Sequence, residues 1–483
     1  MDSMMMMKMK KKKPCALMFP WLGHGHISPF MELSEKLTKR GFDIILCSTP
    51  ANFSSIRSKL AREPEADKSI HLVELHLPSL PGLPPPLHTT NGLPPHLMPA
   101  LKKAFNMSSS NFLAILESHR PDLLVYDLLQ PWAAAAAAVL GIPAVLFVTS
   151  SATMFSHVVH MDKRPGAAFP FDSIYYRPYE VKAAEKSASY EEQERKDKAC
   201  VRACFGRSSN LVLVKGFREA EDKYFQYLSE LTGKRILPVG PLVQEAGGAV
   251  EDNDPFIAFL NSKEKGSTVF VSFGSEYFLS EEDTHCIARG LETSRVNFIW
   301  VVRFPKGKKV NLEEAMPEGF LEGVRGRGMV VDGWAPQANI LAHPSIGGFV
   351  SHCGWNSVME GMKLGVPFIA IPMHLDQPIN ARLVSELGVG EEAVRDRDGL
   401  LHPETIASVI NRVVLEKEGH IVRERAKKVS EKMRDNGEKE ANEVALELHK
   451  LIVTSKQPPA AIPCSFLFSR FNNALPILGL KSN

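Results

Sequence analysis

VSHCGWNSVMEGM, residues 350–362, is the stretch that decides the fold class. An apolar run ends near Ser351, the chain turns on Gly354, and a helix is predicted from there through Met362. A strand that feeds directly into a helix is the repeating unit of a parallel α/β sheet. The unpaired N–H groups and partial positive charge of such a helix start can hold a diphosphate. The alternative interpretation is an ordinary helix cap with a polar first turn.

Outward from this stretch, short apolar runs alternate with amphipathic segments. Strands are predicted at Cys15–Phe19, Asp43–Ser48, Leu123–Tyr126, Ala144–Val148, Thr268–Ser272, Phe298–Val302, Met329–Asp332 and Val366–Pro372. Helices are predicted at Pro29–Arg40, Glu281–Thr293 and within Pro403–Val453. This alternation predicts parallel sheets with helices on both faces, so the fold class is α/β. A chain of 483 residues suits two such domains of roughly 200 residues each.

A linker between the two domains is predicted from composition. This segment contains Pro and Gly at its start, Gly247-Gly248 in its middle and acidic residues at its end. We therefore expect an acceptor-binding domain at 14–240, a linker at 241–254 and a donor-binding domain at 255–454. A basic N-terminal arm at 1–13 and an irregular tail at 455–483 complete the division.

Composition excludes several classes of protein. Lys and Arg number 57 against 55 Asp and Glu, which argues against a nucleic-acid partner. Seven scattered cysteines indicate free thiols in a reducing, cytoplasmic setting. The uncharged stretch 132–155 is interrupted by Gly141-Ile142-Pro143, so a helix, a turn and a buried strand explain it better than a membrane span. We expect a monomer.

Residues on either side of the opening stretch favour ligand binding. Trp334 directly follows a predicted strand, where its ring suits base stacking. Asn356 and Glu360 are four apart and share a helix face, so the carboxylate can accept two ribose hydroxyls. Asp376 and Gln377 follow the next strand at its carboxyl end, where open α/β sheets bind ligands. Together these residues indicate a nucleotide-sugar site.

The segment Trp334–Gln377 resembles the 44-residue signature of plant family 1 UDP-glycosyltransferases. It matches in length, in its first Trp, in His-Cys-Gly-Trp-Asn-Ser, in its Glu and in its terminal Asp-Gln. The resemblance covers about residues 14–453. It implies a GT-B fold, in which two Rossmann-like domains face each other across a cleft. It also implies UDP-glucose as co-substrate, with no cofactor and no metal.

The resemblance implies a role for each matching position. Uracil contacts Trp334 and the backbone of Ala335, and the ribose contacts Gln337 and Glu360. The diphosphate is assigned to Ser275, His352, Gly354, Asn356 and Ser357. The sugar is assigned to Trp355, Asp376 and Gln377. Asp396-Arg397-Asp398 has the spacing of a manganese motif of another glycosyltransferase fold, but it lies in a predicted turn and we expect no metal there.

The same resemblance places the catalytic base in the other domain. His26 matches the family's Gly-x-Gly-His loop, and Asp127 matches the Asp that orients the base and stabilises its cation. His24 and Gly25 become candidates on the acceptor side. From the residues alone, a loop His is usually just solvated, and Asp127 could cap the helix before Trp132. The implied reaction is a single inverting displacement.

Three further segments resemble the subgroup that adds glucose to a sugar already attached to a natural product. They are Leu75–Pro78, His88–Pro95 and Phe273–Phe278. We therefore expect a small glycosylated acceptor (a triterpenoid, flavonoid, lignan or apocarotenoid glucoside) and a 1→6 or 1→2 bond. The alternatives are direct glucosylation of an aglycone and a non-catalytic binder of UDP-sugars. A nicotinamide dehydrogenase lacks its Gly-x-Gly-x-x-Gly motif. One segment, Val214–Phe217, departs from the family's usual Asn-Ser-Phe.

Overall fold

A computed structural model describes residues 13–61, 69–185, 190–243, 254–274, 277–304 and 311–456. Residues 1–12 of the predicted arm, residues 244–253 of the predicted linker and residues 457–483 of the predicted tail lie outside this range. Ser275, assigned above to the diphosphate, also lies outside the described residues.

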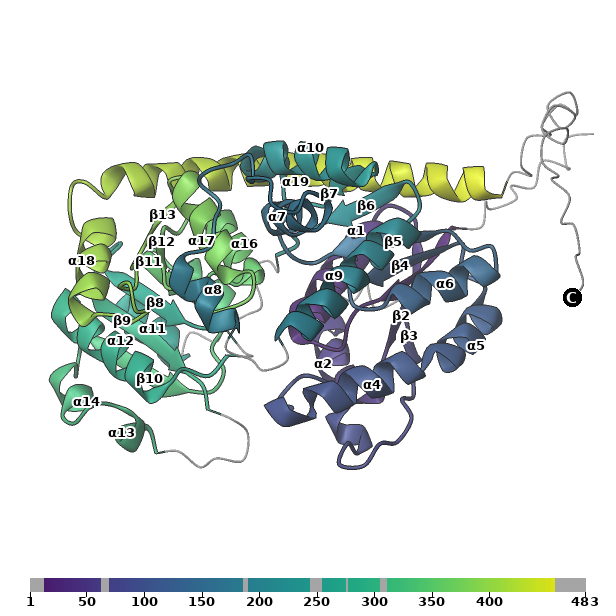
Figure 1. Cartoon of the computed structure of the whole chain (residues 1–483). Coiled ribbons are helices and arrows are strands. Elements are labelled where there is room, and N and C mark those ends of the chain that lie inside the picture. The colour runs from purple at the N-terminus through teal and green to yellow at the C-terminus, as the bar shows by residue number, and fades with distance from the viewer. Residues whose placement is uncertain are drawn as a thin grey trace, which may run out of the picture.

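Two parallel sheets form the two halves of the described chain (Figure 1). The first has the order β3-β2-β1-β4-β5-β6-β7 and the second the order β10-β9-β8-β11-β12-β13. The strands of the first sheet are β1 Cys15–Phe19, β2 Asp43–Ser48, β3 Ile70–Glu74, β4 Leu123–Asp127, β5 Ala144–Val148, β6 Leu211–Val214 and β7 Arg235–Pro238. Those of the second are β8 Thr268–Ser272, β9 Asn297–Val302, β10 Gly328–Asp332, β11 Ile346–Ser351, β12 Phe368–Ala370 and β13 Gly390–Glu392. The α/β class with two Rossmann-like sheets is confirmed.

In each sheet the strand order reverses once. The second and third strands of the sheet lie on one side of its first strand, and the later strands lie on the other side. In the first sheet this point is between β1 and β4, where Phe19 pairs with Tyr126. In the second it is between β8 and β11, where Ser272 pairs with Ser351. Loops diverge at the carboxyl ends of such strand pairs, and open α/β sheets bind their ligands there. The topology therefore marks two places for a site, one in each half.

The helices cover both faces of each sheet. In the first half they are α1 His24–Thr38, α2 Pro50–Leu60, α4 Met98–Met107, α5 Ser109–His119, α6 Pro131–Val139, α7 Ala152–Lys163, α8 Pro178–Glu185, α9 Tyr190–Arg207 and α10 Arg218–Thr232, with 3-10 turns at Pro85–Leu87 and Pro95–Leu97. In the second half they are α11 Pro255–Asn261, α12 Glu281–Ser294, α13 Leu312–Ala315, α14 Phe320–Gly323, α15 Gln337–Leu341, α16 Trp355–Leu364, α17 Gln377–Glu386, α18 Pro403–Val414 and α19 His420–Ser455.

Sequence explains why these elements form where they do. The residues of β4 and β5 are all buried, as expected for strands covered by helices on both faces. Helix α12 begins at Ser280, whose hydroxyl accepts a hydrogen bond from the Asp283 N–H, and three acidic residues fill its first turn. Helix α16 ends at Gly365, which has a φ of 69° and so adopts the left-handed conformation common after helix ends.

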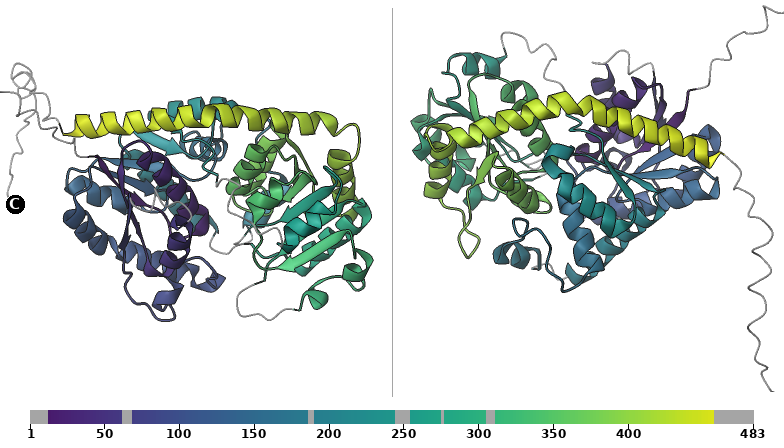
Figure 2. Two further views of the ribbon diagram at one scale, coloured as in Figure 1. Left: turned by 180° about the vertical axis from the view of Figure 1, so that it is seen from behind. Right: turned by 90° about the horizontal axis from the view of Figure 1, so that it is seen from above.

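One long helix joins the two halves. Helix α19 starts beside the second sheet, contacts α16, and runs over the first sheet (Figures 1 and 2). Near its end, Val444, Leu448 and Ile452 are buried in the same apolar core as Phe42 and Leu46. The last turns of the chain's second half therefore stabilise the first half.

Some predicted boundaries were wrong. Helix α1 begins at His24, five residues before the predicted start at Pro29, and β12 is shorter than the predicted Val366–Pro372. The turn before α8 contacts the second half, where Arg177 binds Glu392.

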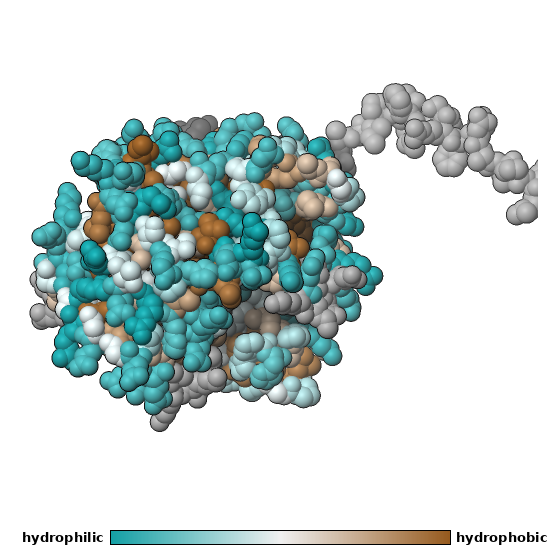
Figure 3. All heavy atoms as spheres, turned by 60° about the vertical axis from the view of Figure 1, so that its left-hand side comes forward, coloured by the Kyte–Doolittle hydropathy of each residue, from teal (hydrophilic) through white to brown (hydrophobic). Residues whose placement is uncertain are grey.

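The stretch 132–155 forms helix α6, a turn, the buried strand β5 and the start of α7, as predicted. Among the described residues, no helix has the length and apolarity needed to cross a membrane. On the face shown in Figure 3, hydrophilic residues dominate and apolar residues occur in small separate groups. Those apolar groups are of the size found on most folded proteins.

Candidate active site

The predicted base and its partner meet at the strand switch point of the first sheet. His26 lies two residues into α1, which follows β1, and Asp127 is the last residue of β4. His26 Nδ1 is 2.8 Å from Asp127 Oδ2, although the residues are 101 positions apart in sequence. Asp127 is fully buried, whereas the side chain of His26 is 31% exposed. The pair therefore places a buried carboxylate behind an accessible imidazole.

Asp127 is held in place by backbone donors. The Trp21 N–H donates to Oδ2 at 3.0 Å and the Leu128 N–H donates to Oδ1 at 2.6 Å. The hydroxyl of Thr149 lies 3.1 Å from His26 Nδ1. With its proton on Nδ1, the imidazole donates to the carboxylate and directs the Nε2 lone pair away from it. This is the arrangement that a general base requires.

An irregular first turn of α1 links the base to the other half. Pro29 has no N–H, so the Gly25 carbonyl lacks the donor that a regular helix would supply from four residues later. Asn356 Nδ2, at the start of α16, donates to that carbonyl at 3.1 Å. The base-bearing turn is thereby joined to the helix predicted to bind the diphosphate.

The N-terminus of α16 has the features of an anion site. Gly354 is its N-cap residue and supplies no side chain to bond the first-turn N–H groups. The His352 imidazole lies against Gly274 and Gly354, where an added Cβ would come within 2.8 and 2.6 Å of its Nε2. Burial lowers the pKa of His352 to about 4, so the ring is neutral at pH 7. Ser357 lies in the first turn and is mostly buried.

The residues predicted to bind the nucleoside also come together. Gln337 begins α15, and its amide Nε2 donates to the Glu360 carboxylate of α16. Burial raises the pKa of Glu360, which the Gln337 hydrogen bond and the Lys215 charge counteract. Trp334 is 69% exposed, which leaves its ring surface open to a stacking partner. Ala335, next to it, is buried.

The residues predicted to hold the sugar make other contacts in this structure. Asp376 accepts a hydrogen bond from Ser150 of the first half at 2.7 Å. Gln377 folds back on its own turn, where Oε1 accepts from the Met373 and His374 N–H groups at 3.0 and 3.1 Å. Trp355 is buried, and its Nε1 donates to the Lys215 carbonyl at 2.7 Å. Asp376 and Trp355 thus both contact residues that follow strands of the first sheet.

Several ion pairs also join the halves. Arg382 of α17 bonds Glu180 of α8 at 2.6 Å and Glu392 at 3.3 Å, and all three side chains are less than a tenth exposed. Arg177 pairs with the same Glu392 carboxylate. These residues therefore form one buried ion-pair network that contacts both halves.

The Pro-rich segment predicted for the acceptor side lies against the base-bearing turn. The Thr90 N–H donates to the Leu22 carbonyl at 3.1 Å, and the Thr49 hydroxyl donates to the His88 carbonyl at 2.6 Å. His24 Nε2 is 3.5 Å from the Asn91 amide. His24 and Gly25 therefore lie next to the segment that resembles the sugar-elongating subgroup.

Thr149, Ser150 and Lys215 were not assigned roles from sequence, yet each contacts a predicted site residue. All three directly follow β5 or β6 at its carboxyl end. The rule that ligands gather at carboxyl strand ends would have pointed to these positions. The Asp396 carboxylate, by contrast, bonds the N–H groups of Asp398 and Leu400 and so shapes its own turn, as predicted.

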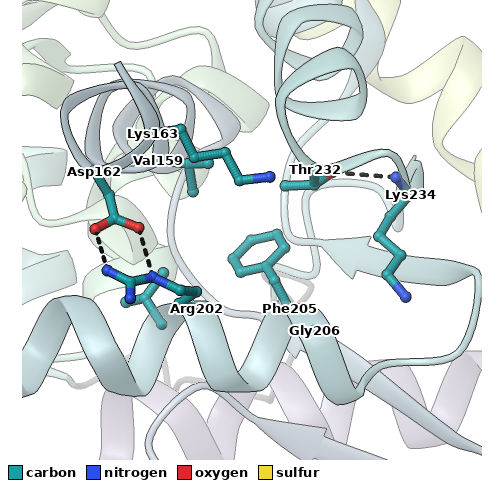
Figure 4. Close-up of a pocket in the computed structure, with 9 residues that line it drawn as sticks. Val159, Asp162, Lys163, Arg202, Phe205, Gly206, Thr232 and Lys234 are labelled. Atoms are coloured by element: carbon teal, nitrogen blue, oxygen red, sulfur yellow. Dashed lines mark hydrogen bonds and ion pairs between the residues drawn. The ribbon is translucent and has the colours of Figure 1, made fainter. Parts of the chain in front are cut away.

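A cavity of about 140 Å³ lies elsewhere, between α7, α9 and α10 (Figure 4). Phe205 and Val159 line it, and the Asp162–Arg202 ion pair lies at one side. None of the predicted site residues lines this cavity.

Comparison with known proteins shows which family the chain resembles. Residues 15–244 match the family model "Glycosyltransferase, N-terminal domain", and residues 240–416 match "UDP-glucoronosyl and UDP-glucosyl transferase". The chain is 49% identical over 440 residues to mogroside IIIx synthase of Siraitia grosvenorii, covering 90% of this chain and 93% of the relative. It is 47% identical over 444 residues to beta-D-glucosyl crocetin beta-1,6-glucosyltransferase of Gardenia jasminoides, covering 91% and 99%.

A solved structure shares the fold. It is that of a UGT transferase from Siraitia grosvenorii in complex with UDP, which is 26% identical to this chain with a TM-score of 0.73. The match covers 90% of this chain and all of that one.

Proposed function

The chain belongs to the UDP-glycosyltransferase family and is an enzyme of that class, and we propose that it transfers glucose from UDP-glucose to a sugar of a small-molecule glycoside. The main observation in favour of catalysis is the His26–Asp127 pair. The hydrogen bond from Asn356 to the Gly25 carbonyl joins the turn that carries His26 to the start of α16. A pure binding protein would have no need of a buried carboxylate behind an exposed imidazole.

The proposed donor site is the surface around α15 and α16. Trp334 stacks on uracil, the Ala335 backbone bonds the base, and Gln337 and Glu360 hold the ribose. The start of α16, with His352, holds the diphosphate, and its partial positive charge stabilises the leaving group. The alignment of residues 240–416 with the family model supports a UDP-sugar, and the choice of glucose rests on the terminal Asp376-Gln377.

The proposed reaction is a single displacement with inversion. His26 removes the proton of the acceptor hydroxyl, whose oxygen then forms a bond to the anomeric carbon. The bond from that carbon to the diphosphate breaks, and UDP leaves with the electron pair. Asp127 stabilises the imidazolium formed in this step. No metal is assigned, and no step requires one.

The acceptor is proposed to be a glycoside because the named relatives include the beta-D-glucosyl crocetin beta-1,6-glucosyltransferase. The segment His88–Pro95, which carries the subgroup resemblance, lies beside His24. This segment is therefore in position to contact the sugar of an acceptor. A 1→6 bond is the first choice and a 1→2 bond the second.

The decisive assay offers UDP-glucose with an aglycone, its monoglucoside and its diglucoside in separate reactions. Transfer to the glucosides, with a kcat/KM at least tenfold above that for the aglycone, is the expected result. NMR of the product distinguishes the 1→6 from the 1→2 bond. Reaction with the free aglycone alone would refute the glycoside acceptor while leaving the donor site and the base untouched.

The division into an acceptor-binding part at 14–240 and a donor-binding part at 255–454 is part of the proposal. So are a cytoplasmic location, which the free thiols of the six described cysteines support, and a monomeric state.

A further inference from the structure

Lys215 is a buried cation at the junction of the two halves. It directly follows β6, and its side chain is only 2% exposed. Its carbonyl accepts the Trp355 Nε1–H at 2.7 Å, and its own Nζ donates to Asn356 Oδ1. A residue of the first half thus bonds two consecutive residues at the start of α16.

Asn356 is held at both ends of its amide. Oδ1 accepts from Lys215, and Nδ2 donates to the Gly25 carbonyl at 3.1 Å. Since an ammonium group can only donate, it fixes which end of the amide faces it. Nδ2 then points to the carbonyl that Pro29 leaves without its helical donor.

Burying Lys215 at this place is unfavourable in itself. Burial lowers its pKa to about 8, and the positive end of α16 and the nearby Lys59 oppose its charge. Glu360 and Glu32 favour the charge. An uncharged side chain of similar length would avoid the cost of burying the ammonium, although it would also remove a charge that favours the Glu360 and Glu32 carboxylates. Stability alone therefore does not account for a lysine here.

We propose that Lys215 is a positioning residue for donor binding, which sets the orientation of the Asn356 amide and so ties the base-bearing turn to the diphosphate end of α16. The inference rests on the proposed function only in taking that helix end as the diphosphate site. It also gives a role to the segment Val214–Phe217, where the family's usual Asn-Ser-Phe is absent and a shorter Asn would stand at 215.

The test compares the full-length enzyme with Lys215→Met, Asn356→Ala and the double variant. Calorimetric titration with UDP, without any acceptor, measures donor-site affinity. Lys215→Met is expected to weaken UDP about tenfold and to raise the KM for UDP-glucose by a similar factor, as for the loss of a charged hydrogen bond. The KM for the acceptor should change less than about twofold. Because Lys215 acts through Asn356, the double variant should bind UDP no more than about twofold worse than Asn356→Ala.

Lys363→Met is the matched control. Lys363 lies on the same helix, in its last turn, and donates to the Val243 carbonyl at 3.1 Å. The Lys363→Met substitution removes an ammonium group from α16 without replacing a residue that bonds Asn356. It should therefore leave UDP affinity unchanged. Lys215→Arg, which keeps a donor cation, should recover part of the lost affinity.

Unchanged UDP affinity in Lys215→Met would overturn the proposal, and so would losses that simply add in the double variant. If Lys215→Met does not fold, Lys215→Gln takes its place under the same criteria. Since UDP titration involves no acceptor, an error in the proposed glycoside acceptor would leave this result unaffected.

Discussion

The two halves build their parts of the site in opposite ways. In the second half, every described residue assigned to the donor lies within Trp334–Gln377, on α15, α16 and the segments beside them. In the first half, the proposed base and its partner lie 101 residues apart and meet only because β1 and β4 are neighbours. The donor site can thus be recognised from one segment of sequence, whereas the catalytic pair depends on the whole sheet. Variants of the His26–Asp127 pair should therefore affect the chemical step, and variants of the donor residues in the second half should affect the binding of the donor. Lys215 belongs with the donor residues, because it acts through Asn356.

The largest effect is expected for His26→Ala. The variant lacks the imidazole that is proposed to take the acceptor proton, and kcat should fall at least about a thousandfold. UDP affinity should change less than about twofold, because His26 is assigned to the acceptor hydroxyl and not to the nucleotide. Steady-state kinetics and UDP titration measure the two quantities. Substantial remaining turnover would contradict His26 as the base.

Asp127→Asn should come next, with a loss in kcat of about a hundredfold to a thousandfold. The amide keeps the size of the carboxylate but can present a donor to His26 Nδ1, which favours the wrong tautomer, and it no longer stabilises the imidazolium. An amide nitrogen in the place of Oδ2 would also lose the hydrogen bond that this oxygen accepts from the Trp21 N–H. Leu128 and Thr149 remain as neighbours of the His26–Asp127 pair, so the variant should still fold. Circular dichroism can check its folding. A change confined to the KM for UDP-glucose would contradict the comparison between the halves.

For the second half, Glu360→Gln should raise the KM for UDP-glucose about tenfold while kcat falls less than about threefold. A carboxylate accepts two ribose hydroxyls as a charged acceptor, and charged hydrogen bonds contribute about 1.5–3 kcal/mol each. The Gln337 amide next to it can still bond the new side chain. A 2′,3′-dideoxyribose analogue of the donor, which lacks both hydroxyls, is the matched control, since it should be bound about equally by both enzymes. A loss in kcat with an unchanged KM would place Glu360 outside the ribose site.

The same contrast explains how far sequence could predict the molecule. Buried strands such as Leu123–Asp127 and Ala144–Val148 are apolar runs bounded by turns, and they were predicted nearly to the residue. The start of α1 was missed because Pro29 usually marks a helix start, whereas here an acceptor freed by Pro29 is bonded from the other half. Lys215 could be noticed as a departure from a motif and as a residue at the carboxyl end of a strand. Its role depends on a contact between segments 141 residues apart, which no local pattern encodes.

The smallest predicted effect is a change in thermal stability, and it comes from a buried carboxyl group in the first half. Glu221 of α10 is fully buried, and its Oε1 accepts from the Thr153 N–H at 2.9 Å and the Thr153 hydroxyl at 2.8 Å. Burial raises its pKa to about 8, partly countered by those bonds. The carboxyl is held close to Gly216, where an added Cβ would lie 2.4 Å from Oε2. A neutral carboxyl is therefore favoured in the folded state.

The contribution of Glu221 to the stability of the enzyme should fall as the pH rises. The folded state binds the proton more tightly than the unfolded state, so the stabilisation is complete below the ordinary pKa of Glu and is lost as pH rises through about 8. Glu221→Gln keeps the acceptor for Thr153 and cannot ionise. Between pH 5 and pH 8.5, the melting temperature of the natural enzyme should fall by about 3–6 °C more than that of the variant, on the order of 2 kcal/mol. Burial raises the pKa of Glu440 to about 7, and the Glu440 charge also raises the pKa of Glu221, so the difference between the proteins reports Glu221 together with this interaction. Equal pH profiles would mean that Glu221 is ionised in the folded enzyme at pH 7.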